Sequence, residues 1–267
     1  MNPEPKPRGL GVAAGLEADI ARALAARCAE LGYTSLWSND HPMASGLETA
    51  AEFAAASSLD VGVAVLPLDR HDPADIASKA GQLGLDPERL WLGIGAGFTK
   101  RPLGVVREGL AAVRSALPRG TRVAIAAMGP KMCALAGAEA DGVFLNWMTP
   151  EKAGWARDHV EEGAAQAGRQ PPEVFGYVRV AVGPDARDRL LKEESFYRQL
   201  HQGYIRHFQS LEREPGTIGV AEEDPASVQA ELAPYEQAID HLVVRALAHA
   251  DVQSLEAVAV AAAPRQR

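Results

Sequence analysis

The sequence predicts an α/β protein folded as a single (β/α)8 TIM barrel, and three observations support that prediction. Short runs rich in Val, Ile and Leu alternate with longer stretches of helical periodicity. Eight such units fill the 267 residues, which is the number that closes a parallel barrel of about 250 residues. No linker rich in Pro, Gly or Ser divides the chain, so we expect one domain over residues 1–267. An open doubly wound sheet is the alternative, but it usually needs fewer strands or a second domain.

Local patterns place the elements in order. We expect strands over Gly9–Ala13, Ser35–Trp37, Val61–Leu66, Leu90–Ile94, Arg122–Ala126, Gly142–Asn146, Val174–Val182 and Ile239–Arg245. We expect helices over Leu16–Leu31, Leu47–Ser57, 73–83, Pro102–Leu117, 130–135, 150–167 and Ser254–Ala261, with Asp72-Pro73 and Thr149-Pro150 as typical helix starts. An enlarged connection, residues 185–235, separates strands seven and eight, and within it residues 212–225 are expected to form a mobile loop.

Charge and composition disfavour several functions. The 27 Lys and Arg residues against 35 Asp and Glu give a net charge of −8, which argues against nucleic acid or an anionic membrane as a partner. Cys28 and Cys133 form no CxxC pair, so we expect no disulfide framework and no metal site. No apolar run reaches the roughly 20 residues that span a bilayer, and no signal core follows Met1, so we expect a cytoplasmic protein.

Barrel chemistry is located in the loops after the carboxyl ends of the strands. Asp40-His41 follows the second strand, where the imidazole can exchange a proton near neutral pH, although Asp and Pro also suit a plain helix-entry turn. Gly95-Ala96-Gly97 permits close approach of a flat ligand or simply tight packing, and it lacks the spacing of a dinucleotide motif. Gly129-Pro130-Lys131 offers free N–H groups, a helix dipole and a cation, which suit a phosphate as well as an ordinary helix start.

Aromatic and imidazole side chains recur in the enlarged connection. Tyr197, His201, Tyr204 and Phe208 have the spacing of one helical face. We expect Phe208 to pack on the barrel wall. Buried hydroxyl and imidazole groups need partners, so the other three would line a substrate pocket if the helix covers the barrel mouth. Trp147, after the sixth strand, is expected to pack at the same mouth.

Five stretches carry a family resemblance in consistent order: Ala29–Pro42, Arg70–Gly97, Ala124–Ala136, Ala140–Glu151 and His241–Ala246. Together they resemble the luciferase-like flavin- and deazaflavin-dependent oxidoreductases, a superfamily of (β/α)8 barrels. The resemblance implies hydride transfer between coenzyme F420, a deazaflavin, and a small organic substrate. An FMN-dependent monooxygenase that uses O2 is the first alternative, and a catalytically impaired cofactor-binding homologue is the second. The family's habit of dimerising implies a homodimer.

The resemblance also implies residue roles. His41 would lie near the reactive ring carbon with Asp40 against the cofactor, a match that favours the deazaflavin branch. His41 or Tyr204 would supply or accept the proton. A non-proline cis peptide is expected at Val65-Leu66, against the ring. Phe98 occupies the position where some deazaflavin-dependent dehydrogenases have a catalytic Glu, and the absence of this acid is compatible with a catalytically impaired homologue.

The same resemblance implies the cofactor-binding residues. The cofactor ring and phosphate would be bound after strands four and five, by Gly95, Ala96, Gly97, Ala127, Met128, Gly129, Pro130 and Lys131. The substrate pocket, which the helical spacing and the loop after the sixth strand suggest independently of the resemblance, would be lined by Trp147, Tyr197 and His201.

Overall fold

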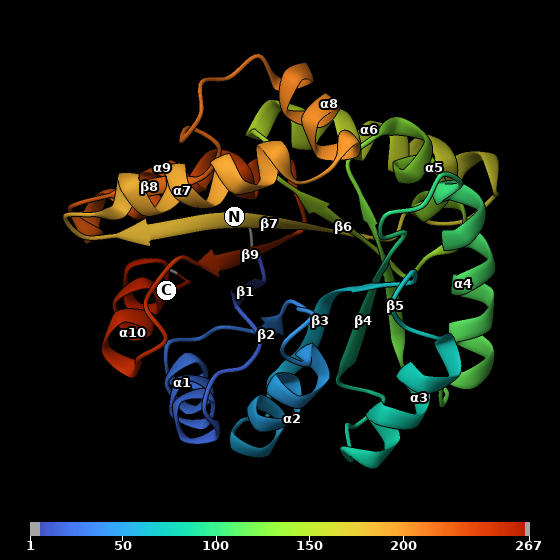
Figure 1. Cartoon of the computed structure of the whole chain (residues 1–267), viewed down its shortest axis with the longest axis horizontal. Helices are drawn as coiled ribbons and strands as arrows, with labels where there is room; N and C mark the ends of the chain where they lie inside the picture. Colours follow the sequence, from blue (N-terminus) through green and yellow to red (C-terminus); the bar gives the residue numbers. More distant parts are fainter. Residues whose placement is uncertain (1–5, 265–267) are drawn as a thin grey trace, which may run out of the picture.

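Eight parallel strands close into a barrel in a computed structural model that describes residues 6–264, and this confirms the predicted fold class (Figure 1). Strands β1 to β7 pair in sequence order, and β9 lies between β7 and β1 to complete the barrel. The short β8 pairs only with the end of β7 and stays outside. The strands are β1 (Arg8–Val12), β2 (Ser35–Ser38), β3 (Asp60–Pro67), β4 (Leu90–Gly95), β5 (Arg122–Ala127), β6 (Gly142–Asn146), β7 (Glu173–Val182), β8 (Val220–Glu222) and β9 (His241–Ala246).

Helices surround the barrel and bury their apolar faces against the outer side of the strands. They are α1 (Ala18–Glu30), α2 (Gly46–Ala56), α3 (Pro73–Gln82), α4 (Pro102–Ala116), α5 (Pro130–Glu139), α6 (Pro150–Gln166), α7 (Ala186–Leu200), α8 (Gln202–Leu211), the 3-10 turn η1 (Pro225–Ser227), α9 (Val228–Ala238) and α10 (Val252–Ala261). The two predicted helix starts are present, since Asp72 accepts from Ala74 N–H and Thr149 from Lys152 N–H. Among residues 6–264, none of these helices has the length and hydrophobicity needed to cross a membrane.

A series of hydrogen-bonded polar side chains fills the barrel at the amino ends of its strands. His241 Nδ1 lies 2.9 Å from Glu173 Oε1, and its Nε2 lies 2.8 Å from Ser35 Oγ. Trp37 Nε1–H donates to the same Ser35 oxygen at 2.8 Å. Above this series, aromatic rings fill the centre, with Trp37 against Phe144 and Phe175. Because these partners satisfy the serine oxygen and both imidazole nitrogens, this end of the barrel is closed by its own side chains.

Helices α5 and α6 cross in very close contact. A Cβ atom on Gly163 of α6 would lie 2.1 Å from the carbonyl oxygen of Ala134 on α5, whereas one on Gly154 of the same helix would meet nothing within 4 Å. The crossing therefore requires a glycine at position 163. Cys133 of α5 and Cys28 of α1 are buried free thiols, and burial raises the pKa of each to about 12.

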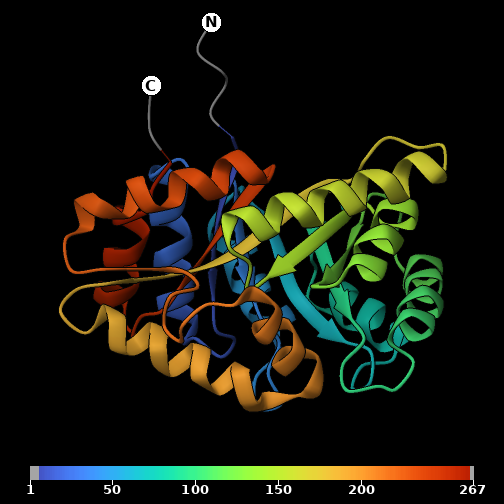
Figure 2. The same ribbon diagram turned by 90° about the horizontal axis from the view of Figure 1, so that it is seen from above.

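The enlarged connection differs from the prediction in two ways. The predicted single helix face through Tyr197, His201 and Tyr204 is wrong, because α7 ends at Leu200 and α8 begins at Gln202. His201 takes an extended conformation between the two helices, and its Nδ1 accepts from Gly203 N–H at 3.0 Å to cap α8. Helix α7 packs on β7 and β8 along one side of the barrel, with α8 next to it (Figure 2).

Part of the predicted mobile loop forms a strand that pairs with β7. β8 lies within residues 212–225, and the buried carboxylate of Glu194 on α7 accepts hydrogen bonds from the N–H groups of Gly216 and Ile218. The prediction that this whole segment is a loop is therefore wrong. A three-residue strand between Gly and Pro residues is too short to show the alternation that identifies strands in a sequence.

Candidate active site

The loop after β2 is held by an ionic network around Asp40. The carboxylate is only 4% exposed and accepts from Arg70 Nη2 at 2.9 Å, from His71 Nε2 at 2.8 Å and from Gly46 N–H at 3.2 Å. Arg70 and His71 follow β3, so the network links two neighbouring loops at the barrel mouth. Asp40 thus fixes the loop from within, and three of its acceptor positions are already used.

His41 lies on that fixed loop and points to solvent. Its N–H and carbonyl pair with Ala44 in a short bridge, and its Nδ1 accepts from Met43 N–H at 3.2 Å. When the ring is neutral, this bond places the proton on Nε2, which leaves an N–H donor free. The residue is therefore available to exchange a proton with a bound molecule.

The ends of β3 and β4 form a wall without bulky side chains. The peptide between Ala64 and Val65 is cis, one bond before the predicted position at Val65-Leu66. A Cβ atom on Gly93 or Gly95 would lie 2.9 or 3.0 Å from the Val65 side chain, so glycine lets the two strands approach there. Val65 faces the interior, whereas Leu66 is buried in the outer core and can offer only its backbone to the mouth.

The loop after β4 is organised by a second carboxylate. Gly97 adopts a left-handed conformation, φ 65°, and Asp69 Oδ2 accepts from Phe98 N–H at 2.7 Å. Any side chain at Gly97 would collide with this carboxylate, since its Cβ would lie 1.8 Å from Asp69 Oδ1. Ala96 and Gly97 remain partly exposed beside the wall, and Phe98 is 63% exposed.

The turn from β5 into α5 is open. Gly129 occupies the N-cap position of α5 without a side-chain cap, and a Cβ on it would meet nothing within 4 Å. Lys131 is exposed, and its backbone N–H comes one residue after Pro130, which has none. Ala127 is buried in the outer core with Met128 partly buried beside it, so their side chains anchor the turn.

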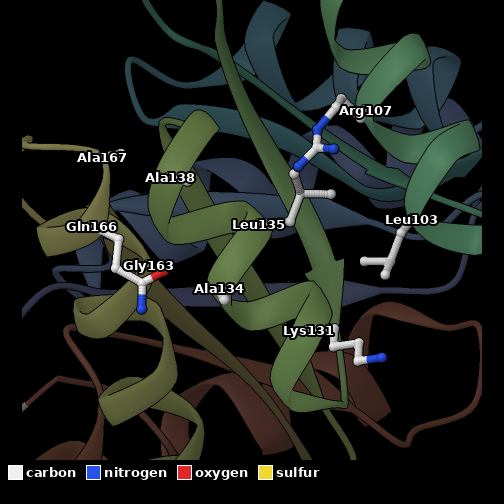
Figure 3. A pocket seen from close by; sticks show the side chains of 9 residues that line it. All are labelled: Leu103, Arg107, Lys131, Ala134, Leu135, Ala138, Gly163, Gln166 and Ala167. Atoms are coloured by element: carbon white, nitrogen blue, oxygen red, sulfur yellow. The ribbon is translucent and has the colours of Figure 1, made fainter.

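Figure 3 shows the side chain of Lys131 at the end of a groove on the outer face of α5, between α4 and α6. Leu103 and Arg107 of α4 line the groove on one side, and Gln166 of α6 lies on the other. The ammonium group therefore lies outside the strands, next to the start of α5. An anion bound at the uncapped turn would meet the helix dipole and have this cation nearby.

Aromatic side chains from α7 and α8 gather over the end of β6. The Trp147 ring lies 5.2 Å from that of Tyr197 and 5.4 Å from that of Phe208, and Tyr197 lies 5.1 Å from Tyr204. The structure thus brings together Trp147, Tyr197 and Tyr204 despite the helix break. Burial raises the pKa of Tyr204 well above its usual range, so its hydroxyl remains a donor at neutral pH.

Two contacts attach α8 to the barrel mouth. His207 Nε2 lies 2.7 Å from the carbonyl oxygen of Trp147, which itself has a left-handed backbone, φ 53°. Burial lowers the pKa of His207, so the ring is neutral and Nε2–H is the donor. The second contact is between the rings of His201 and Phe98, whose centroids are 4.9 Å apart. The helix pair therefore reaches across to the loop after β4.

Sequence reasoning missed four polar residues beneath this aromatic group. Asn146 ends β6 and donates through Nδ2 to Tyr204 OH at 3.2 Å. Arg179 and Tyr177 come from the carboxyl half of β7, and Arg245 stands beside Arg179 on β9. Burial raises the pKa of Tyr177 and lowers that of Arg179. The sequence signal that could have identified the two arginines is their position within the apolar runs Tyr177–Val182 and His241–Ala246. Charged side chains are rarely buried in a strand unless they are paired, so such positions indicate a functional role.

The fold is a (β/α)8 barrel, and polar side chains gather at the carboxyl ends of its strands, where barrels of this class have their active sites. The sequence profile described as luciferase-like monooxygenase matches residues 5–108 and 105–259. The chain belongs to this family.

One curated relative is 5,10-methylenetetrahydromethanopterin reductase of Methanolobus tindarius, 28% identical over 192 residues, which are 58% of this chain and 59% of the relative. The chain therefore matches less than two thirds of the length of that protein.

Solved structures share the fold at low sequence identity. An F420-dependent secondary alcohol dehydrogenase, in complex with an F420–acetone adduct, has a TM-score of 0.74 and 17% identity, with 96% of this chain and 99% of that chain covered. Coenzyme F420-dependent tetrahydromethanopterin reductase of Methanopyrus kandleri has a TM-score of 0.71 and 16% identity over 96% and 97%. The oxygenating constituent of 3,6-diketocamphane monooxygenase of Pseudomonas putida, in complex with FMN, has a TM-score of 0.67 and 16% identity over 98% and 99%. Proteins with this fold thus include two that are described as F420-dependent and one that was solved in complex with FMN.

Proposed function

We propose that this protein is an oxidoreductase that transfers a hydride between coenzyme F420 and a small organic substrate at the barrel mouth. The observation that carries the proposal is the fixed Asp40-His41 loop of β2 beside the wall formed by the ends of β3 and β4. The similarity to a methylenetetrahydromethanopterin reductase, together with the fold shared with a tetrahydromethanopterin reductase that is described as coenzyme F420-dependent, supports the same cofactor class.

The residues at the mouth fit such a cofactor. Val65, flanked by Gly93 and Gly95, offers an apolar surface without bulky neighbours, against which a flat ring can lie. The uncapped turn Gly129–Lys131 would hold the phosphate through backbone N–H groups and the lysine. When bound, the deazaflavin supplies a ring carbon that carries and releases a hydride.

The chain's own groups would then bind, shield and exchange the proton. His41 presents Nε2–H from a loop that Asp40 holds in place. Tyr204 presents a protonated hydroxyl held by Asn146. Trp147 and Tyr197, with the contact between His201 and Phe98, would keep water from the reacting centre.

Separate titrations of the purified protein with F420 and FMN test the proposal, with tryptophan fluorescence as the readout. We expect F420 to bind more tightly, and Lys131→Ala to weaken F420 by about tenfold, as for loss of one hydrogen bond between charged groups. Lys79→Ala is the matched control, because Lys79 is a partly exposed lysine of α3 whose ammonium group pairs with Glu48. Tight FMN binding without F420 binding contradicts the proposal and favours the monooxygenase.

The impaired homologue predicts a different outcome. It would bind F420 normally but give no hydride transfer with any acceptor, and His41→Gln would then change nothing. For an active enzyme, we expect His41→Gln to lower turnover about 100-fold or more with F420 affinity unchanged, since general acid–base catalysis typically contributes that much.

A further inference from the structure

In the part of the chain that the structure describes, three buried polar atoms without a hydrogen-bond partner lie together at the barrel mouth. They belong to Trp147 (Nε1), Tyr177 (OH) and Arg179 (Nε). Within residues 6–264, three other buried atoms also lack a partner, but each is the Nε of an arginine that pairs with a carboxylate through another nitrogen: Arg8, Arg122 and Arg189. The group at the mouth is different, because none of its three side chains forms an ion pair with a carboxylate of the described residues.

Arg179 is the centre of this group. It is 2% exposed and forms no ion pair with a carboxylate of residues 6–264, although the more distant charge of Glu193 on α7 favours its charged form. Nη1 donates to Asn146 Oδ1 and to the carbonyl oxygen of Tyr177, while Nε and Nη2 donate to none of the described residues. The Trp147 ring lies 3.8 Å from the guanidinium carbon, which stabilises the charge but accepts no hydrogen bond in the guanidinium plane. Nε and Nη2 form one edge of the guanidinium, the edge that binds a planar carboxylate with two parallel bonds.

Arg245 adds a second cation. It is the register partner of Arg179 on the adjacent parallel strand, so the two side chains leave the same face of the sheet. Its Nη1 donates to the carbonyl of Ala246, and no carboxylate among residues 6–264 pairs with it. Burial lowers the pKa of Arg179, and the nearby charge of Arg245 lowers it as well, against the opposing charges of Tyr197 and Glu193. Two neighbouring cations with no carboxylate of the described residues paired to them are costly to keep in an apolar barrel, even with Glu193 at a greater distance, unless an anion binds them.

We propose that Arg179, Arg245 and the Tyr177 hydroxyl bind the carboxylate of a small organic acid, which is the substrate. This assignment rests on the proposed function, because it names the substrate class of the same mouth. In the closed strand order, β7 and β9 stand across the barrel from β3 and β4. An acid held by the two arginines therefore extends from this wall toward the wall that would hold the cofactor ring.

Calorimetric titration of the cofactor-free protein tests the anion site directly. The probes are sodium benzoate, acetate and inorganic phosphate, with benzamide as a neutral analogue of benzoate. We expect a carboxylate to bind, benzamide to bind at least about tenfold more weakly, and Arg179→Met to remove that difference, since a charge-assisted hydrogen bond carries about this much. Arg119→Met, at an exposed arginine, is the control that leaves benzoate binding unchanged. A site that prefers phosphate, or that binds no probe at high millimolar concentration, overturns the proposal.

Stability and cofactor binding provide independent readouts. We expect Tyr177→Phe to fold with a melting temperature no lower than that of the wild type, because it removes an unpaired buried hydroxyl. We expect the same of Arg179→Met, because removal of a buried charge without an ion pair offsets the loss of its bonds to Asn146 and the Tyr177 carbonyl. If Arg179→Met lowers the melting temperature and leaves benzoate binding intact, Arg179 is a packing residue and the proposal is wrong. If it weakens F420 as much as benzoate, the anion belongs to the cofactor and the substrate assignment is wrong. Failure of the wild type to bind F420 while it still binds benzoate refutes the proposed function alone.

Discussion

Replacing Asp40 with Asn removes two of the three hydrogen bonds that hold the loop of His41. The amide oxygen can still accept from Gly46 N–H, but the amide nitrogen then faces Arg70 Nη2 and His71 Nε2, both of which are donors. Each bond to a charged group is worth about 1.5–3 kcal/mol. Arg70 and His71 are 33% and 31% exposed, so water replaces part of the loss. We expect the free energy of unfolding to fall by about 2–3 kcal/mol.

Urea unfolding followed by circular dichroism and by tryptophan fluorescence measures this change, and coincidence of the two curves checks two-state behaviour. Asp158→Asn, at an exposed position of α6, is the matched control and is expected to stay within about 0.5 kcal/mol of the wild type. The double variant Asp40→Asn/Arg70→Met isolates the ion pair, and we expect the effects of the two single substitutions not to add. An unchanged midpoint for Asp40→Asn, or full additivity in the double variant, refutes the view that this carboxylate fixes the loop.

Three further predictions concern the elements that support the mouth. Burial lowers the pKa of His207, so as the pH falls the unfolded chain takes up a proton before the folded one does, and the free energy of unfolding should fall below about pH 6.5. Urea unfolding above and below this pH should show a smaller decrease in the free energy of unfolding for His207→Gln than for the wild type. Gly163→Ala should cost about 1–3 kcal/mol by urea unfolding and weaken F420 through displacement of α5, while Gly154→Ala on the same helix should be neutral or stabilising by up to about 1 kcal/mol. Ser35→Ala should lower the free energy of unfolding by about 1–3 kcal/mol, because it leaves the indole and imidazole of the barrel floor without their shared partner.

Local patterns predicted most elements because the signals that define them are local. The helix start at Asp72-Pro73 depends only on a side chain and the N–H two residues on, and the structure forms that bond at 2.8 Å. The break at His201 escaped prediction for the same reason. Aromatic spacing continues across it, and the cap from His201 to Gly203 N–H is visible only once the backbone is placed.

The candidate site was predicted where one loop carries several unusual residues, and missed where residues from distant strands meet. Asp40-His41 and Gly129–Lys131 are contiguous in the chain. Arg179 and Arg245 lie on the strands predicted to be the seventh and eighth of a closed barrel, so their strands were expected to be neighbours, but the register that pairs the two arginines is visible only in the structure. The partner of Asp40 is likewise found on the loop of the next strand, at Arg70 and His71.

Two hydroxyl groups inside the barrel show how its ends differ. Ser35 Oγ at the amino end contacts an indole N–H and an imidazole, and that imidazole in turn contacts the carboxylate of Glu173. Tyr177 OH at the carboxyl end is also buried and has no hydrogen-bond partner among residues 6–264. Loss of Ser35 Oγ should therefore destabilise the fold, whereas loss of Tyr177 OH should not. An unpaired buried group lowers stability, so its retention at the ligand-facing end, next to Arg179, is what a site completed by a bound anion requires.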